Sequence, residues 1–219
     1  MAKNRHVTII DPNCLPLDLE AIDQIKAKSK LPLRIHQPYF NSDSLRGESY
    51  EASAGLILMG SEKSANSNAK WLRELEEFIL GAIHKEIPIL AICFSHQLVA
   101  KLMGGTVSNI PEPEIKELKP VASSDSKLQS SNTGYLLYAH GEYVAEPPKN
   151  TKPWIVDHSP YCSSLEYQEK PIWSLQGHPE ALFSFAEKQG ITIDHVGSHI
   201  NPFDFGQKII QDYLTLLNH

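Results

Sequence analysis

The chain has only three cysteines among its 219 residues, Cys14, Cys93 and Cys162, and no two of them have Cys-x-x-Cys spacing. This small, odd number argues against a disulfide framework, and the spacing offers no pair typical of a zinc or redox motif. Free thiols of this kind are typical of a reducing compartment, so we expect a cytoplasmic protein.

Several other features are absent. No apolar run approaches the roughly 20 residues of a transmembrane helix, so we expect no contact with a membrane. The first residues, Met-Ala-Lys-Asn-Arg-His, lead directly into a strand-like run, and we expect no signal peptide. Positive charge is not in excess, since the formal net charge is −6. This balance argues against nucleic acid as a partner.

The chain is 41% hydrophobic, which is enough for a sizeable core, and no linker or repeat divides it. We therefore expect one domain over residues 1–219. In the first half, strand-like runs alternate with helical ones, which predicts parallel strands with helices on both faces of the sheet. The predicted strands are residues 6–10, 32–36, 55–59 and 87–92, and the predicted helices are residues 17–28, 68–84 and 94–103.

The second half has a different character. It contains short extended segments with turn residues between them, at residues 115–122, 135–139, 154–157, 164–168 and 172–176. We expect these segments to add antiparallel strands to the sheet. The Ser-rich residues 123–132 predict an exposed hairpin loop, and the amphipathic residues 203–217 predict a closing helix.

Residues 88–97, Pro-Ile-Leu-Ala-Ile-Cys-Phe-Ser-His-Gln, are the most informative segment. An apolar run stops at Cys93 and a helix-compatible stretch begins at the next residue, which is typical of a nucleophile elbow. The N-terminus of such a helix stabilises a thiolate and leaves the Phe94 N–H free to hold a developing oxyanion. The alternative is a buried structural cysteine, the commoner fate of a cysteine in an apolar segment.

A second segment favours the nucleophile. Residues 171–180, Pro-Ile-Trp-Ser-Leu-Gln-Gly-His-Pro-Glu, form another apolar run, and it ends at His178 and Glu180. Residues two apart in an extended chain point the same way, and the proline between these two stiffens the link. His178 can therefore act as the base and Glu180 as the residue that orients it, with Cys93 as nucleophile.

These motifs resemble those of class I glutamine amidotransferases of the Cys-His-Glu type. The family's Gly-x-Cys-x-Gly-x-Gln stands here as Ala-Ile-Cys-Phe-Ser-His-Gln at residues 91–97, and Gly-His-Pro-Glu is unchanged at residues 177–180. Residues 55–61 resemble the family's oxyanion strand, and residues 139–142 resemble a segment beside the glutamine pocket. The resemblance covers nearly the whole chain. It is closest to stand-alone GMP-synthase-like members, and plant-type γ-glutamyl peptidases share the motifs.

The resemblance implies a flavodoxin-like three-layer α/β/α sandwich with a mostly parallel central sheet and added antiparallel strands. It implies glutamine or another γ-glutamyl compound as substrate, and its chemistry needs no metal and no organic cofactor. The implied site residues are Cys93, His178 and Glu180 as catalytic triad, the N–H groups of Gly60 and Phe94 as oxyanion hole, and Gln97, His140 and Glu142 as substrate contacts.

The chain departs from the family pattern at four positions. Ala91 and Ser95 replace the two elbow glycines, and Ser61 replaces the second glycine after the oxyanion strand. Each of these three residues adds a Cβ, which allows neighbouring backbone to approach less closely than a glycine does. Because alanine and serine are still small, we expect the turn to survive. Glu142 stands where the family has aspartate, and its longer side chain tilts the prediction towards a divergent substrate.

Three functions remain open. The first is hydrolysis of glutamine through a thioester; the chain has no room for a synthetase domain and no ATP-binding Gly-rich loop, so either a separate synthetase subunit takes the ammonia or the chain works alone. The second is a stand-alone γ-glutamyl peptidase or hydrolase, which cleaves the same γ-amide bond with a larger leaving group. The third is a non-catalytic binding or regulatory module on the same fold. Retention of all three triad residues ranks it last.

Other polar residues have plainer interpretations. His96 occupies an unspecified position of the elbow motif, and we expect it to face solvent or to pack. His195 and His199 have a spacing that binds zinc on a helix, but the glycines and proline around them predict loop histidines instead. The polar residues 61–68 predict either a lid or partner-facing loop, or an ordinary solvated loop.

Overall fold

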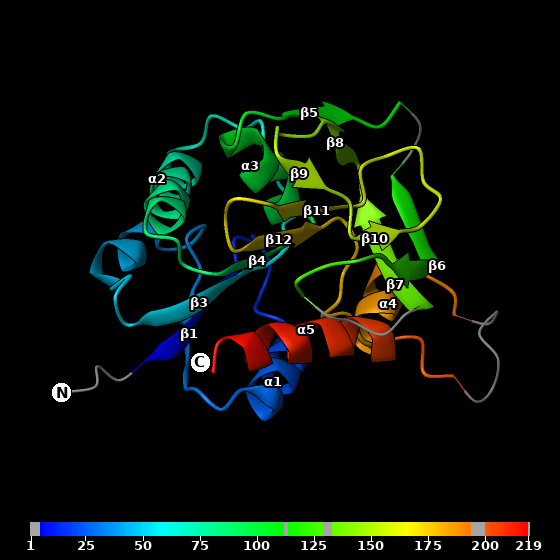
Figure 1. Ribbon diagram of the computed structural model, residues 1–219, viewed down its shortest axis with the longest axis horizontal. Coiled ribbons are helices and arrows are strands. Elements are labelled where there is room, and N and C mark those ends of the chain that lie inside the picture. The colour runs from blue at the N-terminus through cyan, green and yellow to red at the C-terminus, as the bar shows by residue number, and fades with distance from the viewer. Residues whose placement is uncertain (1–4, 112–113, 129–132, 194–199, 219) are drawn as a thin grey trace.

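The computed structural model describes residues 5–111, 114–128, 133–193 and 200–218. A seven-stranded sheet lies at its centre, with the strand order β2-β1-β3-β4-β12-β11-β9 (Figure 1). The first five strands in this order pair in parallel, and β11 and β9 continue the sheet with antiparallel pairing. The strands are β1 (His6–Ile10), β2 (Leu33–His36), β3 (Ser53–Leu58), β4 (Ile89–Ile92), β9 (Thr151–Lys152), β11 (Ser164–Tyr167) and β12 (Ile172–Leu175).

Helices cover both faces of this sheet. Helices α1 (Leu19–Lys28) and α5 (Asp204–Leu216) pack on one face, and α2 (Lys70–His84) and α3 (Phe94–Leu102) pack on the other (Figure 1). Each face has its own apolar core, with Ile25 and Ile209 in one and Leu75 and Leu98 in the other. The 3-10 helix η1 (Ser42–Gly47) and the short helix α4 (Phe183–Gln189) lie in the connections. The predicted three-layer α/β/α sandwich is confirmed.

Local sequence explains where these helices form. In α2, residues at helical spacing such as Leu72, Leu75 and Ile79 are buried, as the apolar pattern predicts. At the start of α1, the Asp18 carboxylate accepts the Ala21 N–H at 3.1 Å and caps the helix. The cap makes the helix begin at Leu19, two residues later than predicted.

Two expectations for the second half are wrong. Strand β12, expected as an antiparallel addition, pairs in parallel with β4. Strands β6 (Ile115–Ser123), β7 (Thr133–His140) and β10 (Ile155–Val156) form a separate three-stranded sheet, and β5 (Thr106–Asn109) pairs with β8 (Glu142–Glu146). All four residues of β12 are buried, as a central parallel strand requires, but a buried antiparallel strand has the same pattern. Strand direction depends here on partners far away in the sequence.

The loop expected at residues 123–132 joins the antiparallel strands β6 and β7. Leu128 in this loop is buried rather than exposed, because it packs into the same apolar core as Trp154. Residues 129–132 lie outside the described residues.

A buried carboxylate joins the segment after η1 to the first two strands. The Glu48 side chain is 0% exposed. It accepts hydrogen bonds from His6 Nε2 at 2.6 Å, His36 Nε2 at 2.9 Å, Arg34 at 3.2 Å and the Thr8 hydroxyl at 3.2 Å. Burial alone raises the pKa of this carboxyl, but the hydrogen bonds from His6, His36 and Arg34 outweigh burial and lower the pKa below its ordinary value. We name these residues the Glu48 cluster.

Candidate active site

Cys93 lies at a sharp turn between β4 and α3, where the sequence predicts a nucleophile elbow. Its backbone has φ 51° and ψ −110°, a region that residues with a Cβ rarely adopt. The Cys93 N–H donates to the Leu175 carbonyl at 2.8 Å, which ties the turn to the end of β12. Strained backbone of this kind is found preferentially at functional sites, because the surrounding structure must enforce it.

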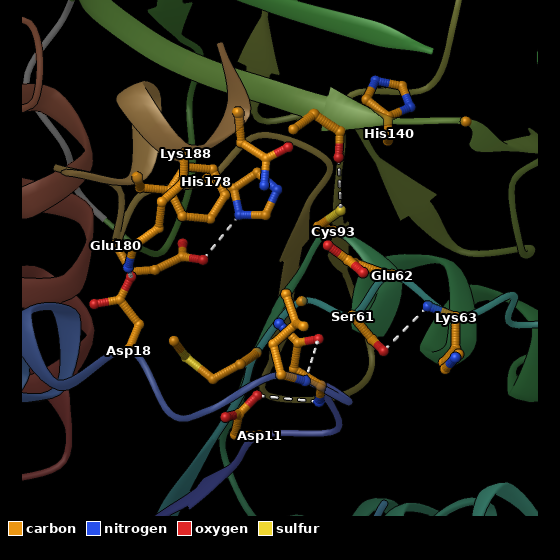
Figure 2. A pocket seen from close by; sticks show the side chains of 18 of the residues that line it. Asp11, Asp18, Ser61, Glu62, Lys63, Cys93, His140, His178, Glu180 and Lys188 are labelled. Atoms are coloured by element: carbon orange, nitrogen blue, oxygen red, sulfur yellow. Dashed lines mark hydrogen bonds and ion pairs between the residues drawn. The ribbon is translucent and has the colours of Figure 1, made fainter. Parts of the chain in front are cut away.

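His178 and Glu180 follow β12 and lie next to Cys93 in the fold. His178 Nδ1 donates to Glu180 Oε1 at 2.8 Å, and both side chains are buried. Because the carboxylate accepts this hydrogen bond, the opposite nitrogen, Nε2, is the one that can take up a proton. Nε2 has no hydrogen-bond partner among the described residues. Figure 2 shows the His178 ring between the Glu180 carboxylate and Cys93.

The charges around His178 favour its protonated form. Burial alone lowers the pKa of His178, but the Glu180 carboxylate and the Cys93 sulfur outweigh burial and raise the pKa well above its ordinary value. His140, across the pocket, behaves oppositely, since burial lowers its pKa to about 4. The pocket therefore holds one neutral imidazole, that of His140, and one imidazole, that of His178, that is well suited to take up a proton.

Gly60 lies two residues beyond the end of β3 and comes close to Cys93 and His178. A Cβ at Gly60 would lie 3.1 Å from His178 Cε1 and 3.5 Å from Cys93 Cβ. Cys93 is thus flanked by the Gly60 backbone on one side and by the first turn of α3, which begins with Phe94, on the other. This is the arrangement that the predicted oxyanion hole needs, and the role of the two N–H groups stays a prediction.

A pocket of about 940 Å³ opens in front of Cys93. Phe94 is the predicted site residue that does not line it, because its side chain is 1% exposed and packs in the core. On the α1 and α4 side, the pocket wall includes Leu17, Phe185 and Lys188. The predicted residues that line the pocket are Gly60, Cys93, Gln97, His140, Glu142, His178 and Glu180.

Comparisons with known proteins identify the family of the chain. The family described as glutamine amidotransferase class-I matches residues 21–192. The chain belongs to this family. It is 30% identical to a GMP synthase (glutamine-hydrolyzing) from Clostridium perfringens over 132 residues, which are 58% of this chain and 24% of that protein. A GMP synthase (glutamine-hydrolyzing) from Borreliella burgdorferi strain N40 is 30% identical over 134 residues, 60% of this chain and 25% of the relative. The match thus spans about a quarter of the length of these relatives.

Solved structures of amidotransferases have the same fold. A glutamine amidotransferase from Thermotoga maritima has a TM-score of 0.74 and 17% identity, with 98% of each chain covered. A glutamine amidotransferase from Methylobacillus flagellatus has a TM-score of 0.68 and 17% identity, and the match covers 96% of this chain and 93% of the other. At these identities the likeness concerns the fold alone.

The class-I elbow keeps its shape without the two family glycines. Ala91 is fully buried in β4, where its methyl group fits the core. The Ser95 hydroxyl donates to the Met59 carbonyl at 2.6 Å, so it ties α3 to the segment that leads into Gly60. The turn survives because both replacements are small and one of them gains a hydrogen bond.

Glu142 fastens the loop of residues 61–68. Its Oε1 accepts from the Ser64 hydroxyl at 2.5 Å and its Oε2 accepts from the Ala65 N–H at 3.1 Å. Lys101 Nζ also donates to the Ala65 carbonyl, at 2.8 Å. These three hydrogen bonds hold the loop of residues 61–68 against the wall of the pocket. A direct contact of Glu142 with substrate stays a prediction.

Gln97 and His140 converge on one backbone oxygen, the Glu142 carbonyl. Gln97 Nε2 and His140 Nδ1 each donate to it at 2.8 Å. Gln97 Nε2 also donates to Gln176 Oε1 at 3.1 Å, and Gln176 Nε2 lies 3.5 Å from Cys93 Sγ. Gln176 was not among the site residues predicted from the sequence. Its position two residues before His178, on the same side of an extended chain, is the signal that could have revealed it.

His96 packs inside the protein and does not face solvent. It is fully buried, with Nδ1 2.8 Å from the Ser174 hydroxyl and Nε2 3.3 Å from the Cys162 carbonyl. Burial lowers the pKa of His96 to about 3, so the ring is neutral at physiological pH. His96 therefore contributes to packing between α3 and the sheet.

Other predicted features fall outside this pocket. His195 and His199 lie outside the described residues. Within residues 5–111, 114–128, 133–193 and 200–218, no three histidine, cysteine or acidic side chains gather as metal ligands. Over the same residues, every helix is too short or too polar to cross a bilayer.

We expect Gly60→Ala to lower turnover by about 10- to 100-fold, because displacement of a catalytic group by less than an ångström has costs of this order. The new Cβ would press on His178 Cε1 at 3.1 Å, and the imidazole must move. Steady-state kinetics would measure the effect, and thermal unfolding would show that the fold is retained. Gly47→Ala is the matched control, because a Cβ at Gly47 meets no atom within 4 Å. Equal turnover in both variants would contradict the close contact.

Proposed function

We propose that this chain hydrolyses a γ-glutamyl amide bond, with the side-chain amide of glutamine as the principal substrate and Cys93 as nucleophile. The observation that carries the proposal is the arrangement of Cys93, His178 and Glu180 in one pocket of a class-I amidotransferase fold. A buried structural cysteine would not need a strained backbone or a neighbouring imidazole whose pKa is raised.

In the proposed first step, the Cys93 proton passes to His178 Nε2 and the sulfur attacks the amide carbon. The oxyanion that forms accepts hydrogen bonds from the Gly60 and Phe94 N–H groups, each contributing roughly 3–4 kcal/mol in comparable sites. His178 then protonates the leaving nitrogen, the C–N bond breaks, and ammonia departs from a thioester. Glu180 stays ionised, fixes the imidazole tautomer and stabilises its charged form.

The second step regenerates the enzyme. His178 removes a proton from water, the hydroxide attacks the thioester carbon, and the C–S bond breaks with release of glutamate. The proton returns to Cys93 or remains on His178. Neither step requires a metal or a redox group.

The fate of the ammonia forms a further part of the proposal. The relatives named GMP synthase (glutamine-hydrolyzing) are about four times as long as the matched region. We propose that a separate synthetase chain receives the ammonia, in the cytoplasm, and that residues 1–219 form one amidotransferase domain.

A stand-alone γ-glutamyl peptidase is the second candidate, and the size of the pocket favours it. A volume of about 940 Å³ that reaches Leu17 and Lys188 exceeds what the side chain of glutamine needs. A leaving group larger than ammonia could occupy the remaining space. The third candidate, a non-catalytic module, has no specific observation in its favour.

The test is turnover of the purified chain on free glutamine and on γ-glutamyl dipeptides, measured as release of ammonia, glutamate and amino acid. We expect glutamine hydrolysis that is slow alone and faster with a synthetase partner. Cleavage of the dipeptides with little glutamine hydrolysis would favour the peptidase. No activity on either, with a folded protein, would contradict both enzymatic candidates.

A further inference from the structure

Gln176 is a buried amide that makes direct contact with the cysteine sulfur. It follows the last residue of β12, is 1% exposed, and its backbone N–H donates to the Ser163 carbonyl at 2.8 Å. Its Nε2 lies 3.5 Å from Cys93 Sγ, within hydrogen-bond distance for sulfur. None of the steps proposed above uses this side chain.

A chain of hydrogen bonds fixes which end of the Gln176 amide faces the sulfur. The Glu142 backbone carbonyl can only accept, so Gln97 must present its NH₂ group there, at 2.8 Å. The same NH₂ group lies 3.1 Å from Gln176, which must then present its oxygen. The NH₂ group of Gln176 is therefore the end that meets Cys93. The orientation follows from one backbone oxygen whose chemistry leaves no choice.

Two neighbours of the sulfur favour different protonation states. The Ala139 carbonyl, 3.7 Å from Sγ, can only accept, so it favours the thiol (Figure 2). The Gln176 N–H can only donate, and a donor interacts more strongly with a thiolate than with a neutral thiol. Once the proton has moved to His178, the Gln176 N–H becomes a hydrogen-bond donor to the negatively charged sulfur.

We propose that Gln176 is a positioning residue for the nucleophile: it holds an N–H on Cys93 Sγ, stabilises the thiolate and fixes its direction in the pocket. This inference rests on the proposed function, in which Cys93 attacks the substrate. Gln97 acts through Gln176, because it holds the Gln176 oxygen away from the sulfur.

The test is the pH dependence of Cys93 alkylation by iodoacetamide, without substrate, in a background in which Cys14 and Cys162 are replaced by serine. Gln176→Leu removes the donor. Gln176→Glu also removes it but keeps an oxygen for Gln97 to contact. We expect the midpoint of the alkylation profile to rise by about one pH unit for Gln176→Leu, which is about tenfold slower alkylation at neutral pH, and further for Gln176→Glu.

Gln207→Leu is the matched control. Gln207 is also a partly buried amide near the triad, but its Nε2 contacts the Pro179 carbonyl at 3.4 Å and not the sulfur. We expect its alkylation midpoint to remain that of the parent chain. If Gln176→Leu fails to fold, Gln176→Glu decides the outcome. An unchanged midpoint in a folded Gln176 variant would overturn the proposal.

Turnover gives a second readout that a merely structural role would not move. We expect kcat/KM of Gln176→Leu to fall by about tenfold at neutral pH and to recover partly at higher pH, where the thiolate forms without help. A loss that is equal at all pH values would overturn the proposal. Turnover by the parent chain tests the proposed function separately, because alkylation needs no substrate.

Discussion

Replacing Cys93 by alanine is expected to lower turnover by at least about 10⁴-fold while the protein stays folded. The substitution removes the sulfur atom that would form the proposed thioester. It leaves the backbone demand at this position unchanged, because alanine and cysteine both carry a Cβ at φ 51°. Ammonia release would measure turnover, and circular dichroism with thermal unfolding would measure the fold.

Cys162→Ala provides the matched control for this result. Cys162 is a second partly buried thiol, burial raises its pKa to about 11, and it does not line the pocket. We expect the Cys162 variant to keep turnover within a few-fold of the parent chain. If Cys93→Ala kept more than a small fraction of the activity, the nucleophile would have to be a different group.

The second large effect concerns stability. We expect Glu48→Ala to lower the free energy of unfolding by about 3–5 kcal/mol, as removal of one partner from a buried ionic cluster does. The variant would leave His6, His36 and Arg34 facing a space without the carboxylate that accepts their hydrogen bonds. Urea denaturation would measure the change. Asp43→Ala is the control, since the Asp43 side chain is 71% exposed and its ion pair with Arg46 lies at the surface.

The same cluster predicts how stability depends on pH. The pKa of Glu48 is lowered in the folded state, so its contribution is fully present above the unfolded value near 4.5 and is lost as pH falls through the folded value. Glu48→Gln, which cannot titrate, should therefore lose less stability than the parent chain between about pH 5 and pH 3. Equal losses over this range would show that the Glu48 cluster does not contribute to acid unfolding.

Much of the fold could be predicted because its signals are local. The buried run of β3, the amphipathic α2 and the sharp change at Cys93 each depend on a few consecutive residues. The direction of β12 and the separate sheet of β6, β7 and β10 depend on pairing between distant segments, which no local pattern encodes. The fold class was therefore predictable, whereas the arrangement of the second half was not.

The candidate site was likewise predictable only in part. Cys93, His178 and Glu180 are recognisable because the residue types and their spacing match the chemistry. The contact of Gln176 with the sulfur depends on the direction of a backbone carbonyl and on the rotation of two amides. The two bonds from Glu142 to the loop of residues 61–68 likewise connect residues more than 70 positions apart. Contacts of these kinds become visible only in three dimensions.

The parallel pairing of β4 with β12 would make the proposed catalysis dependent on the integrity of the central sheet. Leu175 is registered opposite Ile92; the proposed nucleophile, Cys93, directly follows Ile92, and its proposed base, His178, lies three residues after Leu175. A slip of one residue between the strands would turn every side chain to the opposite face. We expect a partly folded state in which these strands have parted to lack a working site. The proposed activity is thus expected to report on the integrity of the central sheet.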